Sequence, residues 1–92
     1  MRIAKVIGTV TLNRCHPSFE GARLRLAVPL SLAELRGDRE PAAEEIVVWD
    51  ENGAGIGSLI AVSEGAEATQ PFRPEMKAVD AYVSAIIDEI NL

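Results

Sequence analysis

The chain contains a series of short segments rich in β-branched residues, and glycine or proline separates them. Such residues favour an extended backbone, whereas glycine and proline interrupt it. We predict strands over residues 3–12, 22–29, 45–50 and 58–63. Gly8, inside the first of these, predicts a bend or a bulge. Several short strands in one small chain favour a small β-barrel.

The predicted strand over residues 22–29 shows the clearest alternation of apolar and charged side chains. Its aliphatic side chains share one face, and they are Leu24, Leu26 and Val28. Arg23 and Arg25 point the other way, because successive residues of a strand point to opposite sides. Pro29 ends the strand, since proline has no amide hydrogen for the next ladder bond.

Residues 52–57 carry the strongest turn signal, Asn-Gly followed by Ala-Gly-Ile-Gly. Asn-Gly between two predicted strands favours a tight hairpin, and the glycines allow close backbone approach. A phosphate-binding loop would need a lysine and a following helix, and neither is predicted here. We therefore interpret the segment as a structural turn. We expect Gly55 to adopt a positive backbone angle that a β-branched residue would not tolerate.

Two further segments predict helical structure. Residues 31–43 are polar and read as a surface excursion, in which Ser31 is suited to cap a helical turn through Leu35. Residues 66–69 predict a short helix, and Pro71 prevents the helix from continuing.

The last segment, residues 78–92, has apolar side chains at two competing spacings. Val79, Val83, Ile86 and Ile90 follow a helical period, whereas the β-rich composition and the spacing of every second residue favour a strand. Periodicity alone leaves both alternatives open.

The chain has 92 residues, of which 48% are hydrophobic, and a formal net charge of −5. This length predicts a single domain over residues 1–92, and so small a domain hides only part of its apolar surface. We therefore expect a partner chain to cover some of the remainder. The acidic balance, with only 9 scattered basic residues, disfavours nucleic acid as a partner.

The sequence also predicts a cytoplasmic location. Cys15 is the only cysteine, so no intramolecular disulfide can form. The first residues lack the apolar core of a signal peptide, and the longest apolar run is far shorter than a membrane span.

Cys15 and His16 are the residues best suited to nucleophilic or metal chemistry. Adjacent residues of an extended chain point apart, and no second ligand cluster or base accompanies them. Asp80, Asp88 and Glu89 likewise lack an acid/base partner. We predict no catalytic site, no metal and no cofactor, and we interpret Cys15-His16 as a surface loop or a subunit contact.

The four aromatic residues are Phe19, Trp49, Phe72 and Tyr82. Proteins that bind single-stranded nucleic acid stack bases on aromatic rings in a basic groove. Four aromatic residues in an acidic chain instead favour core or interface packing. An OB-fold binding module for a small or oligomeric ligand is the alternative reading of a barrel of this size.

Five stretches in order resemble the vertex proteins of bacterial microcompartments, the EutN/CcmL family. They are residues 1–10, 20–24, 50–57, 63–68 and 79–88. The third resembles the family's Asp-x-x-Gly-Ala-Gly-x-Gly turn, and the last resembles its Val-Asp-Ala-x-x-x-x-Ile-x-Asp ending. The chain departs from the family at two positions: it has Ala66 where the family often has Ser, and Trp49 where the family often has a small residue. The polar insert over residues 35–43 also differs from the family's usual connection.

The resemblance implies an all-β fold, a small five-stranded OB-like closed barrel with one short helix. It favours a strand over residues 82–90, because the barrel needs a fifth strand. It also implies a structural protein rather than an enzyme, with five copies closing into a ring at the vertices of a polyhedral shell in the cytoplasm. The implied partners are other copies, in a homopentamer, and hexameric shell proteins, although the sequence leaves a six-membered ring open.

The resemblance also implies candidate residues for the subunit interface or the pore. They are Asn52, Gly53, Ala54, Gly55, Ile56, Gly57, Asp80 and Asp88. We expect the Asp80 carboxylate to cap the turn before the last strand by accepting backbone amides. We expect Asp88 to pair with a basic residue within the chain or across an interface.

Overall fold

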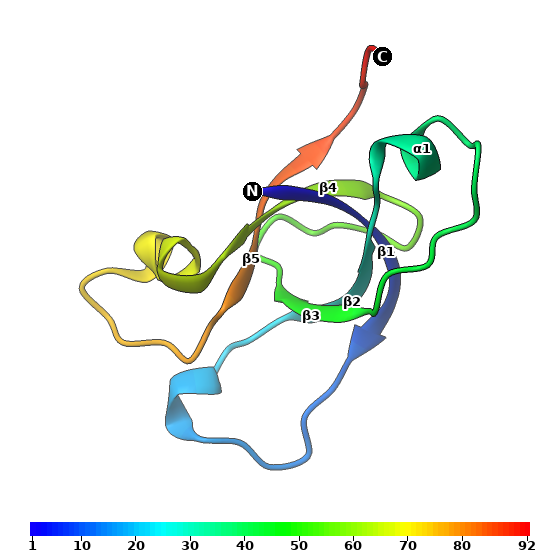
Figure 1. The fold of residues 1–92 in the computed structure, drawn as a ribbon. Helices are drawn as coiled ribbons and strands as arrows, with labels where there is room; N and C mark the ends of the chain where they lie inside the picture. Colours follow the sequence, from blue (N-terminus) through cyan, green and yellow to red (C-terminus); the bar gives the residue numbers. More distant parts are fainter.

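The computed structural model describes residues 1–92 as a closed five-stranded barrel (Figure 1). The strands are β1 (Arg2–Val10), β2 (Leu24–Pro29), β3 (Ile46–Trp49), β4 (Leu59–Glu64) and β5 (Ala81–Ile87). Around the barrel they follow the order β1-β2-β3-β5-β4, and β4 closes on β1. All neighbours are antiparallel except β3 and β5, which are parallel. The predicted fold class is confirmed.

The first strand is bent where its glycine predicts. The register of β1 against β2 shifts between Val6 and Gly8, which marks a bulge. Before the shift, Val6 faces the inside of the barrel. After it, Val10 packs against a second apolar cluster outside the barrel. The bulge therefore lets one strand serve two cores, as bent strands of small barrels do.

Small and β-branched side chains fill the barrel. Nine buried residues form this inner core: Ala4, Val6, Ala27, Val48, Ala54, Ile60, Val62, Ala81 and Val83. Every strand contributes at least one of them, and the remaining one, Ala54, comes from the turn after β3. A five-stranded barrel encloses little volume, and Ile60 is the largest apolar side chain in its interior.

The inner face of β2 is the one that carries an arginine. Ala27 lies in the inner core. Arg25 precedes it by two residues, so it shares the inner face, and its side chain reaches the buried carboxylate of Asp50. Leu24 packs on the outer cluster, and Leu26 and Val28 share its face. The alternation predicted from the sequence is present, but the aliphatic face looks outward, because Leu24 packs in the outer cluster and Arg25 pairs with the buried Asp50.

The chain has one α-helix, α1 (Leu32–Leu35), which lies at one end of the molecule in Figure 1. The Ser31 side chain accepts a hydrogen bond from the Glu34 amide, and the Glu34 carboxylate accepts one from the Ser31 amide. This reciprocal capping box confirms the predicted cap and explains why so short a helix forms.

Two 3-10 helices complete the structure, η1 (Pro17–Phe19) and η2 (Gly65–Phe72). η2 contains the predicted helix 66–69 but continues through Pro71, so the predicted stop was wrong. Proline removes only its own amide, and packing of Ala68 and Phe72 in the outer cluster holds the segment. No helix has the length and hydropathy needed to cross a membrane.

The ambiguous last segment is a strand. β5 pairs with β4 along its whole length, but with β3 only at Trp49 and Tyr82. The strand ends at Ile87 rather than at residue 90, and residues 88–92 extend away from the barrel (the red end in Figure 1). The helical alternative fails because only a strand can supply the ladder that closes the sheet.

Candidate functional site

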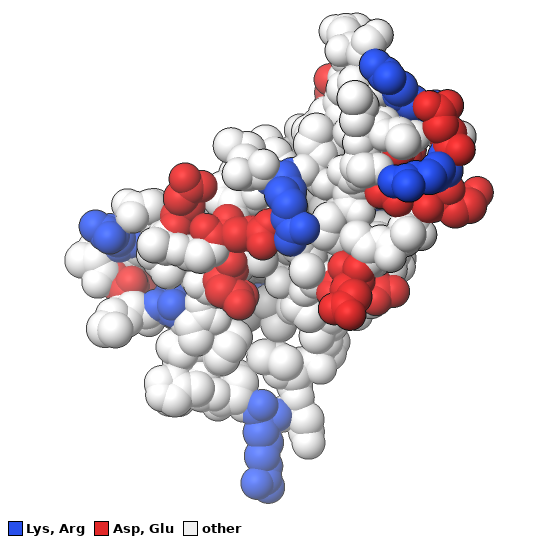
Figure 2. Space-filling view, in the orientation of Figure 1, with Lys and Arg blue, Asp and Glu red and all other residues white.

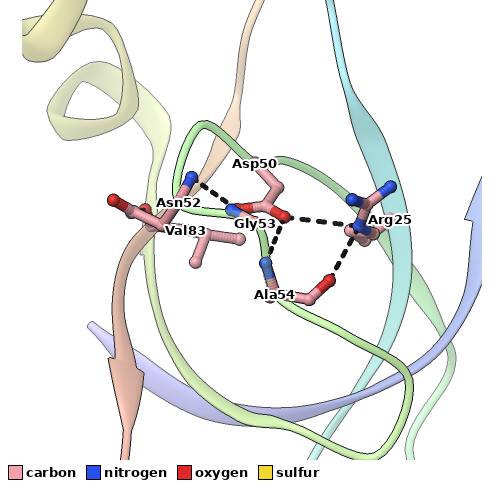
Figure 3. A network of polar contacts seen from close by, with 6 residues as sticks. All are labelled: Arg25, Asp50, Asn52, Gly53, Ala54 and Val83. Atoms are coloured by element: carbon pink, nitrogen blue, oxygen red, sulfur yellow. Dashed lines mark hydrogen bonds and ion pairs between the residues drawn. The ribbon is translucent and has the colours of Figure 1, made fainter.

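The turn between β3 and β4 is organised by one buried carboxylate (Figure 3). Asp50, which is 0% exposed, accepts backbone hydrogen bonds through both oxygens. Its Oδ1 accepts from the amides of Asn52 at 2.8 Å and Gly53 at 3.1 Å, and its Oδ2 accepts from the Ala54 amide at 2.7 Å. Such an Asx turn fixes a loop without help from a β-ladder.

Arg25 closes this network from β2. Its Nε lies 3.3 Å from Asp50 Oδ2 and donates to the Ala54 carbonyl oxygen at 3.0 Å. The charge of the buried carboxylate is thereby balanced, as a buried charge requires. The Ala54 methyl is then held in the inner core, so the turn closes one part of the barrel interior.

Three further bonds tie the turn to the barrel wall. Asn52 Nδ2 donates to the Val83 carbonyl oxygen of β5 at 2.8 Å. The Gly57 amide donates to the Val6 carbonyl oxygen at 2.7 Å, and the Val6 amide donates to the Ser58 carbonyl oxygen at 2.9 Å. The turn is thus anchored to β1, β2 and β5 and presents an exposed tip, where the Ile56 side chain is 73% exposed.

The predicted hairpin at Asn52-Gly53 was wrong. β3 and β4 are not neighbours, because β5 lies between them in the barrel. The Asn-Gly pair serves the Asx turn instead. Positive backbone angles occur at Gly53 (φ 78°) and Gly57 (φ 91°) but not at Gly55, so the expectation for Gly55 was also wrong. A Cβ added at Gly55 would lie 4.0 Å from Ser58 Oγ, an ordinary contact.

The structure brings six of the eight candidate residues together and separates the other two. Residues 52–57 lie together in the turn between β3 and β4. Asp80 and Asp88 lie at opposite ends of β5, and both are exposed. The expected capping role of the Asp80 carboxylate is wrong, because the carboxylate accepts no backbone amide. Only the Asp80 backbone carbonyl accepts a hydrogen bond, from the Gly65 amide. Asp88 makes no ion pair within the chain, and its pairing across an interface stays a prediction.

Asp50 and Arg25 are the site residues that the sequence analysis missed. Asp50 lies in the family-like turn motif but outside the predicted candidate residues 52–57, and Arg25 was predicted only to point away from the aliphatic face of its strand. An aspartate two residues before Asn-Gly is a signal for an Asx turn, and it was available in the sequence. No local signal pairs Asp50 with Arg25, because Arg25 lies on β2 and Asp50 follows the end of β3.

All four aromatic residues form one cluster on the outside of the barrel. Trp49 stacks on Phe19 and meets Phe72 edge to face, and Phe72 meets Tyr82 edge to face. The predicted packing role is confirmed. Burial raises the pKa of Tyr82 to about 12, and the hydrogen bond from its hydroxyl to Glu51 Oε1 acts in the same direction.

Cys15 and His16 lie in the exposed loop between β1 and β2. His16 precedes η1, and its Nδ1 accepts a hydrogen bond from the Ser18 amide at 3.1 Å. No three His, Cys, Asp or Glu side chains are grouped to hold a metal ion.

Charged side chains of both signs gather over α1 and the loop that follows it, and much of the same face is uncharged (Figure 2).

The fold places the chain in the class of small closed five-stranded β-barrel domains. The chain is a member of the EutN/CcmL family, because the family model described as "Ethanolamine utilisation protein EutN/carboxysome" matches residues 1–88.

Named relatives match the chain over its full length. The carboxysome shell vertex protein CcmL of Nostoc sp. is 38% identical over 100% of this chain and 87% of its own length. The microcompartment shell vertex protein PduN of Salmonella typhimurium is 32% identical over 99% of each chain.

Solved structures agree in fold. The pentameric microcompartment shell protein GrpN of Rhodospirillum rubrum matches with a TM-score of 0.82 and 32% identity, over 100% of this chain and 99% of GrpN. CcmL of Gloeobacter violaceus matches with a TM-score of 0.87 and 32% identity, over 100% of this chain and 90% of that CcmL chain.

Proposed function

We propose that this chain is a vertex protein of a bacterial microcompartment shell, in which residues 1–92 form one domain and five copies close into a ring. The observation that carries the proposal is the full-length likeness to GrpN, a pentameric shell protein, at a TM-score of 0.82 and 32% identity. The ring caps a vertex of a polyhedral shell in the cytoplasm, where five-fold closure introduces the curvature that a flat hexameric layer lacks.

The surface of the isolated chain supports assembly. Its accessible area is 6036 Å². A compact monomer of 9.9 kDa is expected to expose about 5,200 Å². The radius of gyration, 13.4 Å, also exceeds the value of about 12 Å expected for 92 residues. The excess area, about 800 Å², is comparable to one partner's share of a standard protein interface.

The outer wall of the barrel carries apolar side chains that the chain itself covers only in part. Ile7, Val47 and Ile86 lie on three different strands and are 42%, 44% and 44% exposed. Apolar side chains on separate strands suit heterologous head-to-tail contacts, which close into a ring when the rotation between copies allows it.

The proposed role is structural, and the residues argue against the alternative of a ligand-binding barrel. An OB-fold binding surface would present aromatic rings and basic side chains along its strands. Here Trp49 is 3% exposed, and the four rings pack on one another. We accordingly propose that the chain acts without catalysis and without nucleic acid, and that hexameric shell proteins are its partners at the ring edge.

Native mass spectrometry of the purified protein tests the ring. Five chains of 9.9 kDa give a species of about 50 kDa, and six give about 59 kDa. A dominant five-copy species supports the vertex role. A six-copy species would retain the ring but contradict a vertex, and a monomer at micromolar concentration would refute the proposal.

A further inference from the structure

An apolar groove opens on the outside of the barrel where β3 and β5 part. It has a volume of about 490 Å³, and its lining includes Val47, Trp49, Val79 and Ala81. β3 pairs with β5 only at Trp49, so Ile46, Val47 and Val48 have a strand partner on the β2 side alone. A free strand edge beside an apolar groove is suited to an extended segment, because the edge offers backbone hydrogen bonds and the groove takes alternate side chains.

Residues 88–92 have the pattern that such a groove selects. They follow β5, form no strand and extend away from the barrel (Figure 1). In an extended chain Asp88, Ile90 and Leu92 share one face, while Glu89 and Asn91 share the other. Leu92 is 63% exposed and Ile90 is half-buried, so its own chain covers only part of the apolar face of this segment.

The charges of the two surfaces are complementary at one end. Lys77 lines the groove, and its only ion pair is a long one, 3.7 Å to the exposed carboxylate of Glu75. Asp88 has no ion pair within the chain. Asp80 also lines the groove, so Asp88 of an incoming segment is favoured at the Lys77 end and disfavoured near Asp80.

The segment cannot reach the groove of its own chain. The groove includes Ala81, the first residue of β5, and the segment begins after Ile87, the last. β5 is about 20 Å long, whereas five extended residues span at most about 17 Å and here point away from the groove. Residues 88–92 can therefore fill this groove only in another copy.

We infer that residues 88–92 of one copy dock in the groove between β3 and residues 77–81 of the next, with Ile90 and Leu92 in the groove and Asp88 paired to Lys77. The contact is heterologous, since the groove and the segment lie at opposite ends of β5. This inference rests on the proposed ring and identifies one of its subunit contacts.

Charge reversal tests the contact. The readout is the protomer concentration at which the five-copy species half-dissociates, followed by analytical ultracentrifugation. Asp88→Lys and Lys77→Glu should each raise this concentration about tenfold or more, and the two together should restore it toward the parent value. Glu89→Lys is the matched control, because it makes the same change of charge on the opposite face of the segment and should leave assembly unchanged.

Disulfide trapping gives a second readout that does not depend on weakened assembly. In a Cys15→Ser background, Ala78→Cys and Leu92→Cys together should give oxidised species of up to five chains, while either alone should not exceed two. An intrachain bridge is excluded, because bridged Cα atoms lie within about 7 Å of each other. The groove contact would be overturned, and the ring left intact, if the five-copy species forms but the two cysteines give no disulfide between chains, and if Asp88→Lys and Glu89→Lys dissociate at the same protomer concentration. Absence of any five-copy species in the parent protein would overturn both.

Discussion

Removal of the Asp50 carboxylate should be among the most destabilising single changes in this chain. Asp50→Ala leaves the Ala54 amide buried without an acceptor, because Ala54 is 2% exposed. A buried unsatisfied donor costs about 1–3 kcal/mol. The same change leaves Arg25, whose side chain is 21% exposed, without its counter-charge. Loss of one partner from a buried pair costs about 3–5 kcal/mol in total. A domain of this length has roughly 5–14 kcal/mol of stability.

Asp50→Asn separates the hydrogen-bonding argument from a simple loss of volume. Each carboxylate oxygen faces two N–H groups, those of Asn52 and Gly53 on one side and those of Ala54 and Arg25 on the other. An asparagine amide has one acceptor oxygen, so in either orientation its NH₂ group meets two donors. We expect Asp50→Asn to be destabilised nearly as much as Asp50→Ala.

The assay is urea unfolding followed by the fluorescence of Trp49, the only tryptophan, at one fixed protomer concentration. Urea is preferred to guanidinium chloride because it does not screen the Arg25 pair. Asp38→Asn, an exposed carboxylate in the loop after α1, is the control and should change the stability by less than about 0.5 kcal/mol. If Asp50→Asn unfolds at the urea concentration of the parent, the network does not hold the turn and the reasoning fails.

Three further predictions follow from the same structure. Tyr82 is the only tyrosine, and its pKa of about 12 exceeds its ordinary value. Its contribution to the free energy of unfolding is therefore complete below about pH 10 and is lost toward pH 12. Ultraviolet titration of tyrosinate should give a pKa of about 12, and Tyr82→Phe should reduce the alkaline loss of stability. Gly57→Ala should cost about 1–2 kcal/mol in urea unfolding, because its φ is 91°, whereas Gly55→Ala should be nearly neutral, and equal effects would contradict the assigned angles. Ser31→Ala should cost about 1 kcal/mol and speed hydrogen exchange of the Glu34 amide, and unchanged exchange would show that the cap is not formed in solution.

Local chemistry alone determined where most elements lie. The first four strands fall within two residues of their predicted ends, because β-branched runs favour extended backbone and glycine or proline interrupts it. The bulge at Gly8 and the cap at Ser31 were also predictable, since each depends on one residue and its immediate neighbours. The resemblance to a family supplied the fifth strand, which periodicity could not decide.

Only the tertiary structure decided which faces are inside and which residues form the site. The alternation of β2 is the same whether its leucines face in or out. The folded chain places them outside, because Leu24 packs in the outer cluster and Arg25 pairs with the buried Asp50. Asn52-Gly53 signals a turn in either case, but β5 separates β3 from β4, so that turn closes no hairpin. Asp50 and Arg25 are 25 residues apart in the sequence, and the closure of the barrel brings their charges to 3.3 Å. Local propensity cannot predict such a pair, because its energy depends on burial that exists only once all five strands have met.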